Sequence, residues 1–233
     1  MALIPRAHHR AALFDLDGTL VDSEPRSFAA WSRLFGAHGV PVDEPLIRSF
    51  VGRRGVDVLP EVMHLFPGMT VGELQTEALS YVRAAGLPPL EPLAGAVELV
   101  RRVAASVPVA LVTSGGRSYA EEALGGLGVR SAFTVLVSAD DVTRGKPDPQ
   151  GYRLACDALG VAPEHAVAFE DAPAGIAAVR AAGSVCVAVA TTHDRTQLSG
   201  ADLVVDSLAE IDWPIMLDGR HNDRSEQTWH SAR

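Results

Sequence analysis

The sequence predicts an α/β protein, with a Rossmann-like parallel β-sheet core and an all-helical cap domain inserted after the first strand. Short apolar runs alternate with helical segments from about residue 95 onward, as in successive βαβ units. The stretch from residue 24 to about residue 86 has helical spacing and no strand-like alternation. Acidic, hydroxyl and lysine residues lie at or near the ends of the expected strands, where open parallel sheets place their sites.

The first strand and the helical stretch come first along the chain. The apolar run 11–16 ends in acidic and glycine residues, which predicts a buried parallel strand. The apolar side chains from Phe28 to Phe35 recur at helical spacing, and the same spacing returns at 58–66 and 74–82. Glycine and proline residues separate these helices.

A segment rich in proline and glycine, 86–95, predicts a hinge between the helical stretch and the rest of the chain. Strands and helices alternate after it, which predicts a parallel sheet covered by helices. The expected strands are 108–113, about 133–138, 165–171, 185–191 and 201–207. The expected helices are about 95–105, 118–127, 149–160 and 173–182.

These elements divide the chain into two domains and a tail. Residues 1–22 and 90–217 are expected to form the α/β core, and residues 23–89 the helical cap. The polar residues 218–233 are expected to form a mobile tail. A chain of 233 residues is long enough for a core with a smaller insert.

Composition limits the function classes. The net charge is -9 and no basic block offsets it, which argues against a general nucleic-acid binder. No apolar run approaches the roughly 20 residues that span a bilayer, and no continuous apolar stretch follows the basic start, so we expect neither a membrane span nor a signal peptide. The two cysteines form no disulfide framework, which favours the cytoplasm. We expect a monomer.

The motif DLDGT places Asp15 and Asp17 at the end of the first expected strand. In an extended backbone, residues i and i+2 point to the same side. Two carboxylates would then face one small volume and repel each other unless a cation lies between them. An acidic turn after a strand fits these two residues equally well when the motif is taken alone.

The motif ALVTSGG places Thr113 at the end of the next expected strand, with Ser114 and Gly115 leading into a helix. A hydroxyl together with backbone N–H groups at a helix N-terminus forms a phosphate-binding site. An ordinary helix cap explains the same residues when they are taken singly.

The third motif, TRGKPDP, contains the single lysine of the chain, Lys146; the other 19 cationic side chains are arginines. A preference for arginine codons explains the arginines but not the retained lysine. A compact ammonium and a planar guanidinium are not interchangeable. We therefore single out Lys146 as a functional candidate.

The fourth motif, AFEDAPAG, places Glu170 and Asp171 at the end of a buried strand. Adjacent acids beside a turn of small residues suit Mg²⁺, which takes a few protein oxygens and keeps several waters. A helix-capping role explains Asp171 when it is taken alone.

In this order, the four motifs resemble those of the haloacid dehalogenase superfamily, in the branch with a helical cap after the first motif. That branch includes sugar phosphatases and β-phosphoglucomutase, and the stretches VTSG, RGKP and FEDAPAG are most similar to bacterial sugar phosphatases. The resemblance covers nearly the whole chain, excluding the ends. It implies a Mg²⁺-dependent phosphatase that hydrolyses a small phosphate monoester, above all a sugar phosphate, through an aspartyl-phosphate.

The resemblance also implies roles for the acidic residues. Asp15 would attack phosphorus, and Asp17 would protonate the departing oxygen and then accept a proton from water. Mg²⁺ would bind the side chains of Asp15 and Asp171 and the backbone carbonyl of Asp17. Glu170 would act through water.

The phosphoryl oxygens would be held by Thr113, Lys146 and the loop at Ser114 and Gly115, again by resemblance. The cap would close over the site and select the leaving group. Arg53 and Arg54 are its candidate substrate contacts, although two solvated arginines explain them as well.

Several alternatives use similar residues. A β-phosphoglucomutase-like phosphomutase remains open, but the segment DSEPRSFAAW lacks the cap histidine of that enzyme. A dehalogenase needs no second acid at the position of Asp17. A phospho-accepting receiver domain places its acidic pair at the first strand, whereas here Lys146 precedes the Glu170–Asp171 pair. Arg117, which follows the Thr113 loop, is a further candidate contact.

Overall fold

The computed structural model describes residues 9–50, 55–82 and 86–215, and its described part contains a six-stranded sheet in the order β5-β4-β1-β6-β7-β8. Every neighbouring pair in this sheet is parallel, which confirms the α/β fold class expected from the sequence. The order reverses around the central strand β1, because the chain continues to β4 on one side and to β6 on the other. In such sheets the crevice beside the reversal is the usual binding site.

The strands are short and buried, since helices cover both faces of the sheet. Their bounds are β1 Ala11–Phe14, β4 Val109–Val112, β5 Phe133–Val137, β6 Ala166–Glu170, β7 Val185–Val189 and β8 Leu203–Val205. The first expected strand was 11–16, but β1 ends at Phe14, so both aspartates of the DLDGT motif lie beyond the regular strand.

Alternate residues of each strand enter two apolar cores, one on each face of the sheet. Ala12 and Phe14 contribute to the core under helices α5 and α6, whereas Ala11 and Leu13 contribute to the core under α7 and α8. The bounds of these helices are α5 Ala96–Ala104, α6 Arg117–Gly126, α7 Gln150–Leu159 and α8 Pro173–Ala182. Short 3-10 turns lie at Met63–Leu65, Arg130–Ala132, Ala139–Asp141, Pro163–His165 and Leu208–Glu210.

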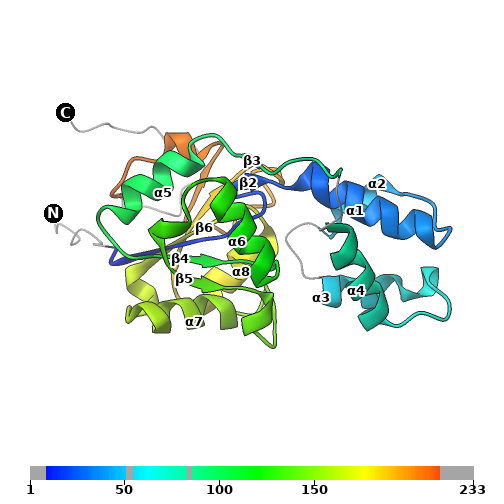
Figure 1. The fold of residues 1–233 in the computed structure, drawn as a ribbon. Helices are drawn as coiled ribbons and strands as arrows, with labels where there is room; N and C mark the ends of the chain where they lie inside the picture. The colour runs from blue at the N-terminus through cyan, green and yellow to red at the C-terminus, as the bar shows by residue number, and fades with distance from the viewer. Residues whose placement is uncertain (1–8, 51–54, 83–85, 216–233) are drawn as a thin grey trace.

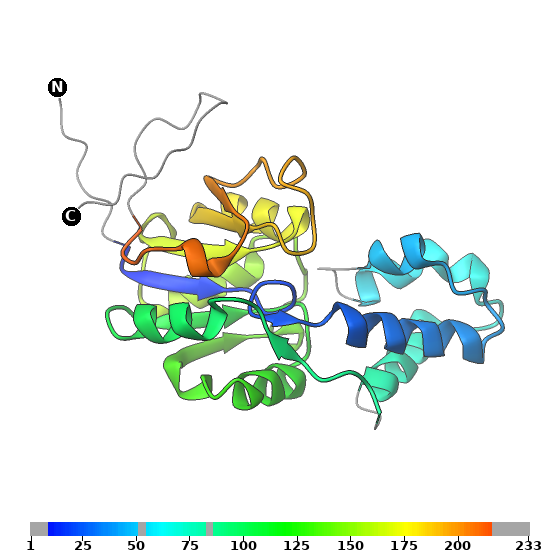
Figure 2. The ribbon, with the colours of Figure 1, turned by 90° about the horizontal axis from the view of Figure 1, so that it is seen from above.

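The stretch expected to be helical forms a separate group of helices beside the sheet, as Figures 1 and 2 both show. Their bounds are α1 Glu24–Ala37, α2 Glu44–Arg48, α3 Gly55–Val62 and α4 Val71–Val82. Phe35, Phe50 and Phe66 pack edge-to-face within an apolar cluster that draws only on these helices and their connections. We refer to this group as the cap.

A small antiparallel ribbon joins the two chain segments that connect the cap to the sheet (Figure 2). It pairs β2, Val21–Asp22, with β3, Glu91–Pro92. From the sequence, only a hinge was expected at 86–95, because strands of two residues leave no periodic pattern to detect. Among the described residues, no helix is long and apolar enough to cross a membrane.

Candidate active site

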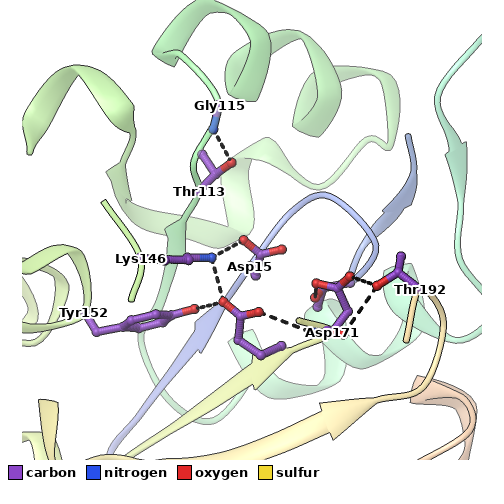
Figure 3. Close-up of polar contacts among 9 residues, drawn as sticks. Asp15, Thr113, Gly115, Lys146, Tyr152, Asp171 and Thr192 are labelled. Atoms are coloured by element: carbon purple, nitrogen blue, oxygen red, sulfur yellow. Dashed lines mark hydrogen bonds and ion pairs between the residues drawn. The ribbon is translucent and has the colours of Figure 1, made fainter. Parts of the chain in front are cut away.

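Asp15, Thr113, Lys146 and Asp171, which were singled out in the sequence, lie together where β1, β4 and β6 end (Figure 3). A cavity of about 410 Å³ lies there, between the strand ends and the cap. Its core wall includes Asp15, Asp17, Lys146, Glu170 and Asp171. The cavity is within the size range of small-molecule sites.

Asp15 and Lys146 form a buried ion pair at the centre of this wall. The backbone N–H of Asp15 donates to the carbonyl of Phe169 at 3.0 Å, which continues the register of β1 against β6 for one residue. Lys146 Nζ donates to Asp15 Oδ1 and also to Glu170 Oε1, the latter at 2.6 Å. The side chains of Lys146 and Asp15 are each only 7% exposed. A single buried ammonium therefore bridges the carboxylate that follows β1 and the one that ends β6.

Tyr152 on α7 supports this bridge and was not foreseen from the sequence. Its hydroxyl donates to Glu170 Oε1 at 2.5 Å, and Lys146 Nζ lies 5.4 Å from the centre of its ring. The other oxygen of Glu170 accepts the backbone N–H of Asp171 at 3.1 Å. Glu170 is therefore held on both oxygens, as a buried carboxylate requires.

Asp171 is also held by a residue that sequence reasoning missed. The hydroxyl of Thr192, which follows β7, donates to Asp171 Oδ2, and the hydroxyl of Thr19 lies 3.5 Å from Oδ1 (Figure 3). Gly18 makes this packing possible, because its φ is 78° and a Cβ there would collide with the Asp171 carboxylate. A Cβ on Gly175 would likewise collide with the Glu170 carboxylate.

The cluster carries more negative than positive charge. Ligand atoms of Asp15, Glu170 and Asp171 lie within 4.8 Å of one another, and all three residues are buried. Burial raises the pKa of Asp15 to about 7, with Glu170 and Asp17 adding to the effect and Lys146 opposing it. Burial, followed by the charges of Asp15 and Glu170, raises the pKa of Asp171 well above its usual range.

One lysine cannot balance these carboxylates. Burial alone would lower the pKa of Lys146, but the charges of Asp15 and Glu170 raise it, so this side chain stays cationic. When all three carboxyl groups are ionised, one ammonium leaves a deficit of positive charge. Their oxygens are the donors that hard divalent cations prefer, so the residues present fit such a cation.

Asp17 lies in the same cavity but outside the cluster. Both aspartates line the cavity, but the clustered ligand atoms belong to Asp15, Glu170 and Asp171 and not to Asp17. The hydroxyl of Tyr119 on α6 donates to Asp17 Oδ1 at 2.5 Å. Burial, followed by the charge of Asp17, raises the pKa of Tyr119, so the phenol keeps its proton.

The loop after β4 presents backbone to the cavity. Thr113 Oγ1 accepts the N–H of Gly115 at 2.9 Å, which fixes the turn that leads to α6 (Figure 3). Ser114, Gly115 and Gly116 line the cavity. Thr113 is buried, and its hydroxyl shapes the loop with which it was expected to hold the phosphoryl oxygens.

Three arginines were predicted as candidate substrate contacts, and the structure describes only one of them. Arg53 and Arg54 lie outside the described residues. Arg117 donates to the carboxylate of Asp141 at 2.8 Å and to the carbonyl of Leu136 at 3.1 Å, and it does not line the cavity. Its position makes it a brace for the neighbouring loop rather than a substrate contact.

The cap wall of the cavity is mainly apolar. Val56 on α3 and Leu79 on α4 are each 39% exposed, and both face the cavity. Gln75 also lines it, and its Oε1 is buried without a hydrogen-bond partner among the described residues. The remaining cap residues along the cavity are Ser23, Glu24, Arg26, Ser27, Ala30, Trp31, Phe50, Gly55, Ala78 and Val82.

Comparisons with known proteins identify relatives of this chain. Residues 9–183 match the family model of haloacid dehalogenase-like hydrolases. The chain is 47% identical over 207 residues to validoxylamine A 7'-phosphate phosphatase of Streptomyces hygroscopicus subsp. limoneus, covering 88% of this chain and 97% of that one. It is 37% identical to hexitol phosphatase A of Escherichia coli (strain K12), with 85% and 91% covered.

A solved structure shows the same architecture. CbbY from Rhodobacter sphaeroides, in complex with phosphate, superposes with a TM-score of 0.77 at 27% identity. The match covers 86% of this chain and 95% of that chain. The likeness extends over both the sheet and the cap.

Proposed function

This chain belongs to the haloacid dehalogenase-like hydrolase family and is a phosphoric monoester hydrolase, and from that premise we propose that it hydrolyses a sugar phosphate with Mg²⁺, through a phosphoryl group carried on Asp15. The observation that carries this proposal is the convergence of Asp15, Lys146, Glu170 and Asp171 at the ends of β1 and β6. The residues at one strand end alone cannot carry out this reaction, whereas the four residues together can.

The cation would be held by the side chains of Asp15 and Asp171 and by the backbone carbonyl of Asp17, with Glu170 acting through water. When bound, Mg²⁺ offsets the charge of the phosphate and of the carboxylates that approach it. Lys146 contributes a fixed positive charge beside Asp15, where a dianionic ester would otherwise be repelled.

The reaction uses two aspartates in two steps. In the first, an oxygen of Asp15 bonds to phosphorus while the bond from phosphorus to the alcohol oxygen breaks, and Asp17 gives its proton to that oxygen. In the second, water bonds to phosphorus, its proton passes to Asp17, and the bond to Asp15 breaks. Orthophosphate leaves, and both aspartates return to their starting states.

The phosphoryl oxygens would rest against the loop after β4. Ser114 and Gly115 present this loop to the cavity, and Thr113 fixes its turn. Backbone N–H groups at the start of a helix are suited to anions. Positioning and electrostatics carry most of the catalysis in phosphoryl transfer, so a rigid loop is an advantage.

The cap would select the alcohol part of the ester. Its apolar wall suits the C–H face of a sugar or polyol. Relatives are named for validoxylamine A 7'-phosphate, hexitol phosphate and fructose-1-phosphate, which supports a phosphorylated sugar or polyol here.

A panel of phosphate esters tests this function. Purified protein with Mg²⁺ is assayed for orthophosphate with validoxylamine A 7'-phosphate, hexitol phosphates, fructose-1-phosphate and phosphoglycolate. We expect the sugar and polyol esters to be hydrolysed with higher kcat/KM than phosphoglycolate. Conversion of β-glucose 1-phosphate into an isomer without release of orthophosphate would instead establish the phosphomutase alternative.

A further inference from the structure

The geometry points to Tyr119 as a positioning residue, which holds the Asp17 carboxylate on the leaving-group side of the cavity and away from the cation cluster. This inference rests on the proposed function, because it assigns Tyr119 a part in the two proton transfers of Asp17. Tyr119 and Asp17 both line the cavity, and their oxygen atoms lie 2.5 Å apart.

The Tyr119 ring is fixed by the same loop that faces the phosphoryl group. Tyr119 is the third residue of α6, and its ring packs against Gly115 so closely that a Cβ on Gly115 would lie 2.8 Å from it. Gly115 in turn is held by the Thr113 hydroxyl at 2.9 Å. A substrate phosphate seated on this loop and an acid held by Tyr119 would therefore keep a constant spacing.

Asp17 needs such support because of its place in the chain. It lies two residues after Asp15, next to a cluster that attracts cations. A carboxylate drawn onto a bound cation would lose the freedom to carry a proton. A hydrogen bond from the phenol holds Asp17 Oδ1, so Oδ2 is the oxygen that we assign to proton transfer.

The same hydrogen bond suits both steps of the reaction. An ionised carboxylate only accepts hydrogen bonds, so the phenol donates. When Oδ2 carries the proton, Oδ1 still accepts from Tyr119, so the contact survives each change of protonation. The proton on Oδ2 passes to the alcohol oxygen as the ester bond breaks, and Oδ2 regains a proton from the attacking water.

The experiment replaces Tyr119 with Phe, which keeps the ring and removes the hydroxyl. Tyr81→Phe is the matched control, because the Tyr81 hydroxyl donates to Glu77 on the same cap helix and does not line the cavity. Both variants and wild type are assayed with a sugar phosphate and with p-nitrophenyl phosphate. The second ester releases p-nitrophenolate, which leaves without taking up a proton.

For the sugar phosphate, we expect Tyr119→Phe to lower kcat about tenfold or more, with KM within about twofold, because general acid–base catalysis is worth about 10²–10⁴-fold. For p-nitrophenyl phosphate, the first step stays fast and only the water step slows. A rapid-quench experiment should therefore show one equivalent of p-nitrophenolate released in a burst, followed by slow turnover. Tyr81→Phe should match wild type.

An equal loss on both esters without a burst, or wild-type kinetics throughout, would overturn the inference. If Tyr119→Phe folds poorly, Tyr119→Met fills the same apolar space without a hydroxyl and is held to the same burst criterion. Failure of the proposed function has a different signature, since wild type itself would then release no orthophosphate from either ester.

Discussion

The core wall and the cap wall of the cavity differ in charge and in burial. On the core wall, Asp15, Lys146, Glu170 and Asp171 are buried, and hydrogen bonds or ion pairs hold each of them. On the cap wall, apolar side chains predominate, and two of the large ones remain 39% exposed. The core wall holds its charged groups in one fixed arrangement, whereas the cap wall offers mainly apolar surface to a ligand.

This difference has a physical cause. Charges can be buried only where partners satisfy them, and the register of β1 against β6 sets those partners in place. The cap has its own apolar core. It is connected to the sheet through short segments, which pair in a ribbon of two strands of two residues each. The core wall is therefore suited to chemistry that all substrates share, and the cap wall to contacts that differ between substrates.

Asp15→Asn should have the largest effect. The amide keeps the shape of the side chain but removes the nucleophile, and loss of a nucleophile has cost about 10⁶-fold in kcat elsewhere, so we expect a loss of about 10⁴-fold or more. Steady-state assays with every active ester of the panel measure it, with circular dichroism as the control for folding. Near wild-type turnover would refute the assignment.

Lys146→Arg should come next, with a loss of about 10²-fold or more in kcat, comparable to removal of a single charge-stabilising donor. The side chain of Lys146 is 7% exposed and contacts the carboxylates of Asp15 and Glu170. A planar guanidinium does not fit where a compact ammonium does. Arg144→Lys is the matched control, since Arg144 is exposed and pairs with Asp148. Normal rates in Lys146→Arg would make the single lysine a coincidence of composition.

Divalent cations should stabilise the core wall in a pH-dependent way. Burial raises the pKa of Asp15 to about 7 from a usual value of 3.8, so the metal-free native state binds more protons than the unfolded state between these values. Its stability then falls as pH rises through that window. Because cations bind the ionised form, Mg²⁺ should raise Tm more at about pH 7.5 than at about pH 5.5.

Thermal unfolding with and without Mg²⁺ measures this shift, and a chelator should abolish activity. Asp171→Asn is the control, because it removes one of the clustered ligands and should lose most of the Mg²⁺-dependent rise in Tm. An equal rise in the variant would place the cation elsewhere.

Leu79→Ala should have the smallest effect and act on selectivity. Removing apolar contact from the cap wall should lower kcat/KM for the sugar phosphate about threefold to tenfold, in line with the modest discrimination of apolar pockets. The value for p-nitrophenyl phosphate should change less. Leu154→Ala, on the exposed side of α7 and outside the cavity, should change neither. Equal losses on both esters would remove the cap wall from substrate selection.

Much of the fold and the location of the site could be predicted because each motif follows an apolar run. Asp15, Thr113 and Glu170 come at or directly after strands, and parallel strands bring their carboxyl ends to one edge of the sheet. Lys146 could be identified for another reason, because it is the single lysine of the chain.

The supporting residues could not be predicted in the same way. Tyr119, Tyr152 and Thr192 reach the acids from two helices and a loop, and their reach depends on how these elements pack rather than on a local pattern. The end of β1 at Phe14 rather than at residue 16 could not be predicted either, because strand ends are not marked in sequence to within two residues.

The most direct test of the account is the site of phosphorylation. Wild-type protein with Mg²⁺ is mixed with a rapidly reacting ester, quenched in acid within one turnover and digested, and the phosphorylated peptide is sequenced by mass spectrometry. We expect one phosphoryl group on Asp15, which forms and decays at rates compatible with kcat. A phosphoryl group on another residue, or turnover with no phosphorylated protein at any time point, would contradict it.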